Sequence, residues 1–125
     1  MGLTTLKRRS EFLRVRGGLR WATPSLVLEA KPRAAISPEG GSSEAERPRF
    51  GFTVSKKVGK AVVRNRVRRR LKAAVRELLS SARAGFDYVI VARPVAAERA
   101  YADLKADLAE ALARIHRSGR SKRVR

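Results

Sequence analysis

The stretch of sequence that most constrains the fold combines a helical repeat of apolar residues with a dense run of basic ones. Between residues 63 and 78 apolar side chains recur at steps of three and four, which places them on one side of an α-helix. They are Val63, Val67, Leu71, Ala74, Val75 and Leu78. The pattern predicts a helix from residue 60 to about residue 84, with this apolar stripe packed in a core.

The remainder of this predicted helix is basic. Residues 55–72 contain nine Lys or Arg and no acidic residue. Arg64, Arg68 and Lys72 follow one flank of the apolar stripe, and Arg66 and Arg70 follow the other. Like charges four residues apart destabilise an isolated helix by roughly 0.2–0.5 kcal/mol per pair. A polyanionic partner explains this accumulation better than the stability of the helix does.

The charge of the whole chain points in the same direction. Its 125 residues carry a net charge of +19, which is typical of proteins that bind nucleic acid. An anionic membrane surface is the weaker alternative, because basic amphipathic helices also bind lipid. The sequence contains no cysteine, which excludes disulfides and thiol chemistry. We expect one cytoplasmic domain over residues 1–125, with no signal peptide or transmembrane segment.

Apolar runs on both sides of the basic helix predict a small sheet. Residues 19–21, 25–31 and 49–55 have the composition of strands, and Phe50, Phe52 and Val54 share one face by alternation. The continuous apolar run at residues 88–92 predicts a strand that is buried on both faces. Gly85, Phe86 and Asp87 are expected to form the turn before it.

Two further helices complete the predicted fold. A short helix is expected over residues 9–16, with Ser10 as its cap and Gly17-Gly18 as its end. A final amphipathic helix is expected over residues 101–115. The order of helix, strands, helix, strand and helix predicts an α+β sandwich in which helices cover one sheet.

Two segments are expected to lie outside the core. Residues 32–48 combine prolines with a Gly-Gly-Ser-Ser run and three glutamates, which is typical of a flexible surface loop. Residues 117–125 form a basic tail, which we expect to be mobile.

Catalytic groups are scarce in this sequence. His116 is the only histidine, and its place near the end of the last predicted helix favours a solvated or cap-assisting side chain. Asp103 and Asp107 lie off the apolar stripe of that helix, where an ordinary solvated face explains them. Gly59 and Lys60 lack the other residues of a phosphate-binding loop. The sequence offers groups for binding, but no self-sufficient active site and no metal site.

These binding groups fit RNA better than a sequence-specific DNA site. Arginine and lysine favour phosphate contacts, and no second helix precedes the basic one closely enough for a helix-turn-helix. Aromatic side chains could stack unpaired bases, although most of them are expected in the core: Phe12, Trp21, Phe50 and Phe52. Phe12 in particular is expected to pack onto the sheet.

Two adjacent segments resemble the protein subunit of bacterial ribonuclease P. They read Phe-Gly-Phe-Thr-Val-Ser-Lys-Lys-Val-Gly at residues 50–59 and Ala-Val-Val-Arg-Asn-Arg-Val-Arg-Arg at residues 61–69. Within them, the triplet at residues 64–66 matches the RNR motif of that family. Three further blocks resemble, in order, the first helix, the last strand and the final helix of the family: residues 9–12, 86–93 and 104–115.

The resemblance implies a fold and a division of labour. The fold is an α/β sandwich like the second domain of ribosomal protein S5. It has a left-handed strand–helix–strand crossover through the basic helix, although about 98% of such crossovers are right-handed. The RNA subunit would cleave precursor tRNA with magnesium and release the 5′ leader. The protein would bind that RNA and the single-stranded leader, with no cofactor, small-molecule substrate or membrane of its own.

The resemblance also implies which residues contact RNA. The leader would lie in a cleft between the first helix and the sheet, with Phe12, Arg16 and Phe52. The catalytic RNA would contact a larger set: Lys56, Lys57, Lys60, Arg64, Asn65, Arg66, Arg68, Arg69, Arg70 and Lys72.

Three positions depart from the pattern of the family. Arg16 stands where a second aromatic is common, Glu29 where an aromatic or polar leader contact is frequent, and Lys60 where asparagine is frequent. Leader binding is therefore expected to rely more on charge and less on stacking. The alternative function is that of a ribosomal-type protein, which would bind rRNA through the same helix without taking part in catalysis.

Overall fold

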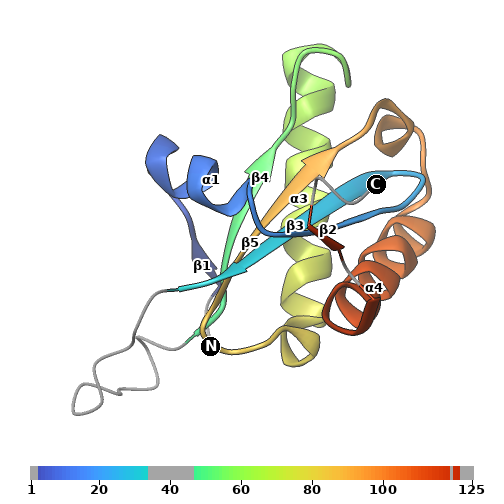
Figure 1. Cartoon of the computed structure of the whole chain (residues 1–125). Coiled ribbons are helices and arrows are strands. Elements are labelled where there is room, and N and C mark those ends of the chain that lie inside the picture. Colours follow the sequence, from blue (N-terminus) through green and yellow to red (C-terminus); the bar gives the residue numbers. More distant parts are fainter. Residues whose placement is uncertain (1–2, 34–46, 119, 122–125) are drawn as a thin grey trace.

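The computed structural model describes residues 3–33, 47–118 and 120–121, which form one mixed β-sheet with helices on both faces (Figure 1). Within these residues the sheet has six strands, in the order β1-β4-β5-β3-β2-β6. The strands are β1 Thr4–Thr5, β2 Leu19–Ala22, β3 Leu26–Pro32, β4 Arg49–Thr53, β5 Phe86–Ala92 and β6 Arg120–Ser121. The helices are α1 Arg9–Val15, α3 Ala61–Glu77 and α4 Tyr101–Ser118, with short 3-10 helices η1 Leu79–Ser81 and η2 Pro94–Ala97. The predicted α+β architecture is confirmed.

β5 is the central strand of the sheet. It pairs with β3 in antiparallel and with β4 in parallel. Tyr88, Val89 and Ile90 are buried and alternate between the two faces, as the continuous apolar run predicts. The strand begins earlier than expected, so Phe86 and Asp87 belong to it and not to the preceding turn. The chain reverses direction at Gly85, whose φ of 80° suits glycine.

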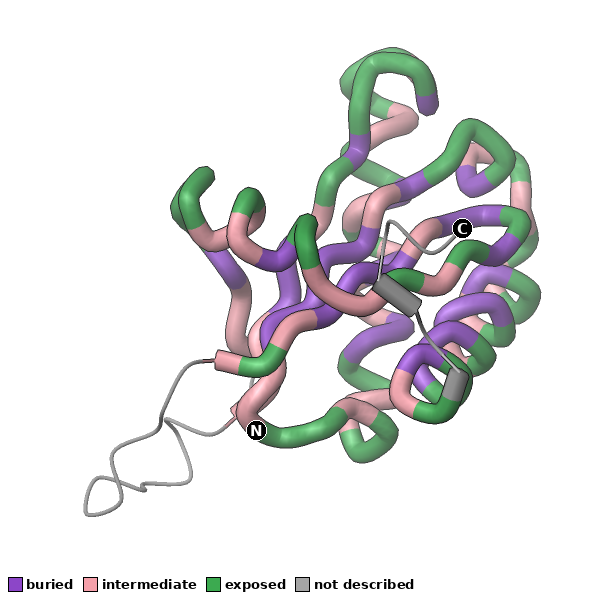
Figure 2. The backbone as a smooth tube through the Cα atoms, in the orientation of Figure 1, coloured by how far each residue is buried: buried purple, intermediate pink, exposed green. Residues whose placement is uncertain are grey.

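α3 and α4 cover one face of the sheet and enclose most of the core (Figure 1). The predicted apolar stripe of α3 makes this contact, because Val67, Leu71, Ala74 and Val75 are all buried. Figure 2 shows buried positions along the strands and on the sheet-facing side of α4. The sheet and α4 contribute the largest remaining buried side chains: Leu26, Leu28, Phe50, Tyr88, Ile90, Leu104, Leu108, Leu112 and Ile115.

The connection from β4 through α3 to β5 is a left-handed crossover. In Figure 1 the two parallel strands point upward, β5 lies to the right of β4, and α3 runs down behind them. A right-handed crossover would place the helix in front of the strands in this view. The handedness implied by the family resemblance is thus confirmed, although the general rule for such units favours the opposite hand.

The small helix α1 covers part of the opposite face. Its only buried residue is Val15, which packs with Leu6 and Val89 in a small second cluster. The carboxylate of Glu11 caps the helix by accepting the backbone N–H groups of residues 7 and 8 at 2.9 and 3.0 Å. The prediction of Ser10 as the cap is wrong, because a glutamate in the first turn reaches back to these donors.

Other boundaries also differ from the prediction. α3 ends at Glu77, where the backbone leaves the helical region at Leu78 and tightens into η1. The strands β1 and β6 are each two residues long, too short to produce a sequence pattern. Residues 117–118, which were expected in the basic tail, extend α4, and residues 120–121 form β6, which pairs with β2. The rest of that tail and residues 34–46 of the predicted loop lie outside the described residues.

Candidate nucleic-acid interface

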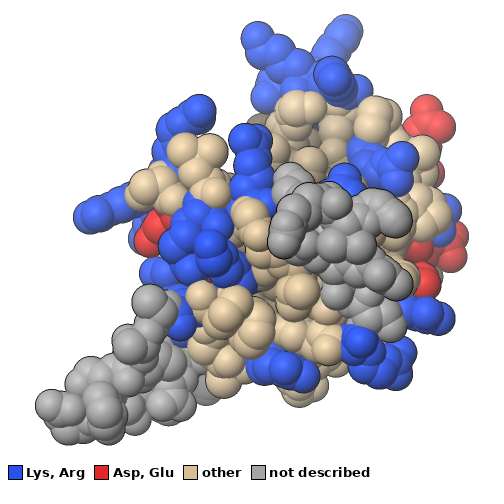
Figure 3. Space-filling view, in the orientation of Figure 1, with Lys and Arg blue, Asp and Glu red and all other residues tan. Residues whose placement is uncertain are grey.

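The basic residues on and before α3 lie on the surface, as their positions beside the apolar stripe predict. Gly59 turns the chain after β4, and Lys60 stands at the start of the helix. The exposed members are Lys56, Lys57, Lys60, Asn65, Arg66 and Arg69, and the half-buried members on the flanks are Arg64, Arg68, Arg70 and Lys72. Figure 3 shows Lys and Arg side chains gathered where β4 leads into α3, with no acidic side chain among them.

The arginines on one flank of α3 donate hydrogen bonds to uncharged oxygens. Arg64 Nε donates to the carbonyl of Gly59 at 3.0 Å, and Arg68 donates to Asn65 Oδ1 at 3.2 Å. Within the described part of the chain, no carboxylate forms an ion pair with a cation between positions 56 and 76. These hydrogen bonds orient the guanidinium groups without neutralising their charge.

The other flank is held against the segment that joins η2 to α4. Arg66 donates to the carbonyl of Ala97 at 3.0 Å, and Arg70 donates to the carbonyl of Arg99 at 2.9 Å. The predicted contact residues are therefore brought together on one surface, with several of them already restrained. Restraint lowers the conformational entropy that these side chains lose when they bind a phosphate.

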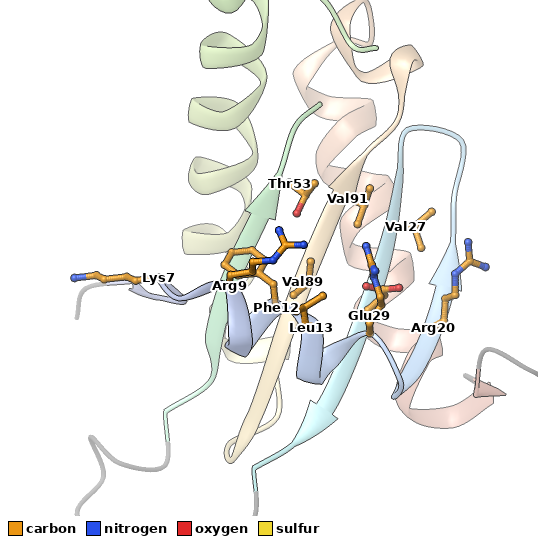
Figure 4. Close-up of a pocket in the computed structure, with 11 residues that line it drawn as sticks. Lys7, Arg9, Phe12, Leu13, Arg20, Val27, Glu29, Thr53, Val89 and Val91 are labelled. Carbon is orange, nitrogen blue, oxygen red and sulfur yellow. The ribbon is translucent and has the colours of Figure 1, made fainter. Parts of the chain in front are cut away.

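A second candidate surface is a cleft of about 750 Å³ between α1 and the sheet. Its floor consists of residues from three adjacent strands, which Figure 4 shows projecting on the same side of the sheet. α1 supplies one wall through Phe12 and Leu13, the latter 46% exposed. The floor residues are Val27, Glu29, Thr53, Val89 and Val91.

Phe12 both packs on the sheet and lines this cleft. A Cβ atom on Gly51 would lie only 2.4 Å from the Phe12 ring, so the glycine permits the ring to approach the strand closely. The ring is half-buried and packs against the small cluster that includes Val89. The interpretation of Phe12 as a core residue and its implied place in the cleft are thus compatible.

The rim of the cleft is cationic, whereas its floor contains one carboxylate. Four cations line it: Lys7 from the segment before α1, Arg9 from α1, Arg16 from the end of α1 and Arg20 from β2. That carboxylate is Glu29, which is 6% exposed and interacts with other residues of the protein. Its position follows from the alternation in β3, where Leu28 and Ala30 face the core and Val27 and Glu29 face the cleft.

The structure does not bring Phe52 into this cleft. Phe52 alternates with Gly51 and Thr53, so it lies on the face covered by α3, where Lys72 Nζ lies 5.9 Å from its ring centroid. Its predicted grouping with Phe12 and Arg16 needs this correction. The alternation noted in the sequence already contained the signal, because it assigns Phe52 to the same face as Phe50.

A buried ion-pair cluster at one end of the cleft was not apparent from the sequence. Asp87 of β5 has no exposed surface, and its carboxylate accepts hydrogen bonds from Arg14, Arg33 and Arg49. Burial alone would raise the pKa of Asp87, but the hydrogen bonds from Arg49, Arg33 and Arg14 outweigh that effect and lower it. Because Asp87 was expected in the turn before this strand, neither its burial nor its three arginine partners were predicted.

Two other acid–base residues are less exposed than expected. Asp107 is buried, accepts a hydrogen bond from Ser25 Oγ at 2.6 Å and pairs with Arg99 at 2.9 Å. His116 is half-buried, with Nε2 2.7 Å from the Tyr88 hydroxyl, and burial lowers its pKa. The prediction of solvated side chains is wrong at both positions, because α4 lies across the sheet and brings them against β5 and the segment before β3.

Within the described ranges, no three His, Cys, Asp or Glu side chains are grouped so as to hold a metal ion. The helices of the same ranges are too short or too polar to cross a bilayer. The arrangement of the cationic groups suits the binding of phosphates and, in the cleft, of an extended polymer.

Solved structures share this fold. The ribonuclease P protein from Thermotoga maritima superimposes with a TM-score of 0.73 at 22% sequence identity, covering 89% of this chain and 96% of that one. The RNase P protein of Staphylococcus aureus gives a TM-score of 0.71 at 24% identity, covering 90% of this chain and 94% of that one. At these identities the likeness concerns the fold.

Sequence comparison is more specific. Residues 3–116 match the profile of the Ribonuclease P family. The ribonuclease P protein component of Paramagnetospirillum magneticum is 47% identical over 115 residues, which span 90% of this chain and 83% of the relative. That of Ruegeria pomeroyi is 42% identical over 117 residues, which span 92% and 88%. The chain therefore belongs to the family of ribonuclease P protein components.

Proposed function

We propose that this chain acts with a ribonuclease P RNA in an endoribonuclease that removes the 5′ leader of precursor tRNA. Family membership supports the role in a ribonuclease P holoenzyme and the RNA partner. In this proposal the RNA subunit carries out the cleavage with magnesium, and the protein contributes binding. The protein offers one surface on each side of its sheet, the exposed face of α3 for one RNA segment and the cleft beside α1 for the other.

The exposed face of α3 is the docking surface for the ribonuclease P RNA. Its cations are restrained by backbone carbonyls and by Asn65, and no described carboxylate pairs with them. A structured RNA supplies phosphates from several strands, and each phosphate contact releases counterions. Arg64, Asn65 and Arg66 lie in the first two turns of α3, where the positive end of the helix dipole adds to their charge.

The cleft beside α1 holds the single-stranded leader. Phe12 presents a half-buried ring for stacking, and Arg9, Arg16 and Arg20 are placed to contact phosphates along the rim. Because Arg16 stands where an aromatic is common in the family, charge contributes more here and stacking less. Phe52 has no part in this assignment, since its side chain lies on the opposite face.

The observation that carries the proposal is the separation of two cationic surfaces on opposite faces of one sheet. A protein that binds a single rRNA site through α3 has no use for a second, cation-rimmed cleft with an aromatic wall. The ribosomal-type alternative therefore leaves the cleft unexplained, whereas a complex of catalytic RNA and precursor tRNA uses both surfaces.

The test is the cleavage of precursor tRNA by the cognate RNA at low magnesium, with and without the protein. We expect the protein to accelerate cleavage and to increase the affinity for precursor tRNA more than for mature tRNA. Binding of the protein to an rRNA fragment of equal length provides the control. Equal affinity for both RNAs, with no stimulation of cleavage, would favour the ribosomal-type alternative.

A further inference from the structure

α1 has few apolar contacts to hold it on the sheet. It contains seven residues, of which only Val15 is buried, and Leu13 is nearly half exposed. A helix of this length is not stable by itself in water. Among the described residues, the apolar cluster beneath it contains three buried residues, compared with nineteen in the core under α3 and α4. Apolar burial therefore contributes less to holding α1 on the sheet than to holding α3 and α4.

Asp87 supplies a polar attachment. Its Oδ2 accepts a hydrogen bond from Arg14 of α1 at 2.6 Å and one from Arg49 of β4 at 2.8 Å. Its Oδ1 accepts from Arg33 at 2.7 Å and again from Arg49 at 2.9 Å. One buried carboxylate thus joins α1, the end of β3, β4 and β5, and bidentate pairing with Arg49 fixes its orientation.

The same cluster also reaches the start of α1. Arg49 Nη1 lies 3.3 Å from Glu11 Oε2, and the other carboxylate oxygen of Glu11 caps the helix. At the end of the helix, Arg14 also donates to the carbonyl of Pro32 at 3.0 Å. Both ends of α1 are therefore attached to the sheet through Arg14 and Arg49, and both arginines meet at Asp87.

This attachment lies outside the cleft, but it holds the helix that supplies one wall of the cleft. Phe12 lies between Glu11 and Arg14 in the sequence, and Arg16 follows one half-turn later, so rotation or tilt of α1 moves both. Asp87 does not itself line the cleft. We propose that Asp87 is a positioning residue for leader binding, which sets the distance of α1 from the sheet through Arg14 and Arg49.

The inference rests on the proposed function, and the sign of the effect of Asp87→Asn tests it. This variant raises the net charge by one, so electrostatics alone would strengthen the binding of every RNA. Loss of the fold would weaken the binding of precursor tRNA and of mature tRNA equally. A positioning role predicts that the holoenzyme loses about tenfold in affinity for precursor tRNA and keeps its affinity for mature tRNA.

A matched pair of arginine variants separates attachment from charge. Arg14→Met and Arg33→Met each remove one positive charge and one contact to Asp87, but only Arg14 belongs to α1. We expect amide hydrogen exchange of residues 12–16 in the free full-length protein to accelerate at least about fivefold in Arg14→Met and Asp87→Asn, and to change less than about twofold in Arg33→Met. The loss of affinity for precursor tRNA should likewise be larger in Arg14→Met and Asp87→Asn than in Arg33→Met.

Three results would overturn the inference. They are unchanged exchange of α1 in Arg14→Met, equal effects of the two arginine variants, and stronger precursor binding by Asp87→Asn. A failure of the proposed function looks different, because the wild-type holoenzyme would then bind precursor and mature tRNA equally. The exchange measurement needs no RNA, so it still decides whether Asp87 holds α1.

Discussion

The two faces of the sheet are built on different principles. The face under α3 and α4 is closed by a continuous apolar core, in which Leu71, Leu108 and Ile90 are fully buried. The face under α1 has a small apolar cluster, an open cleft and a buried ion-pair cluster. Stability is therefore concentrated on one side, which leaves the other side free to be shaped for a ligand.

Arginine has a different task on each face. On α3 the guanidinium groups of Arg64, Arg66 and Arg70 donate to backbone carbonyls and keep their full charge. On the α1 face, Arg14 and Arg49 pair with carboxylates and act as structural links. The number of basic residues alone therefore overstates how many are available to bind RNA.

The largest expected effect is on the free energy of unfolding. The same substitution, leucine to alanine, can be made in the apolar cluster on each face of the sheet. Leu71→Ala should lower the free energy of unfolding by about 2–5 kcal/mol, because it leaves a cavity in a closed core. Leu6→Ala should cost about 2 kcal/mol or less, because its cluster lies beside an open cleft and can relax. Urea unfolding measures both values. Equal losses would contradict the distinction between the faces.

The next effect concerns Phe12, the aromatic side chain that lines the cleft. Phe12→Ala should reduce the affinity of the holoenzyme for precursor tRNA by roughly 5- to 150-fold, equivalent to about 1–3 kcal/mol, through loss of one stacking contact. Affinity for mature tRNA, which has no leader, should stay nearly unchanged and provides the control. Equal losses for the two tRNAs would mean that Phe12 acts only by packing against Gly51 and the small apolar cluster.

A smaller and salt-dependent effect is expected on the opposite face. The double variant Arg64→Ala, Arg68→Ala should weaken binding of the ribonuclease P RNA and reduce the salt slope of log K by up to about 0.9 per lost contact. Stability should change little, since neither side chain belongs to the apolar stripe. The control is Arg117→Ala, which removes a positive charge from an exposed position in the last turn of α4, away from the proposed docking surface. A slope that falls equally in the control would remove α3 as the docking surface.

The smallest effect is the acid sensitivity of the α1 face. The charged groups that face Asp87 are Arg14, Arg33 and Arg49, with Glu11 reached through Arg49. The hydrogen bonds from the arginines lower the pKa of Asp87 below its ordinary value. The ionised carboxylate therefore stabilises the folded state above about pH 3.9, and this stabilisation is lost as the pH falls toward the lower pKa of the folded protein. Asp87→Asn lacks this dependence.

Unfolding in urea at pH 6, 4 and 3 measures the acid effect. The difference in stability between wild type and Asp87→Asn should narrow as the pH falls. A difference that stays constant over this range would show that ionisation of Asp87 does not stabilise the fold.

What the sequence predicted was local, and what it missed depends on distant partners. The stripe from Val63 to Leu78 and the apolar run in β5 reveal themselves by spacing within one element. The partners of Asp87 lie 38 to 73 positions away in the chain, so no local pattern indicates them. Asp107 and Ser25 are 82 positions apart. The error at Phe52 has a different cause. The alternation that places Phe52 on the same face as Phe50 was visible in the sequence, but it was not used when Phe52 was assigned to the cleft.

The brevity of β1 and β6 bears on how such a protein avoids association with its own copies before RNA is bound. An exposed edge strand invites another chain to add to the sheet, and a long flat edge is an aggregation hazard. Here β1 pairs with the first two residues of β4, and β6 pairs with the first two residues of β2, so neither edge of the described sheet presents a long continuous row of free backbone groups. Such short and interrupted edges give another copy of the chain little backbone to pair with.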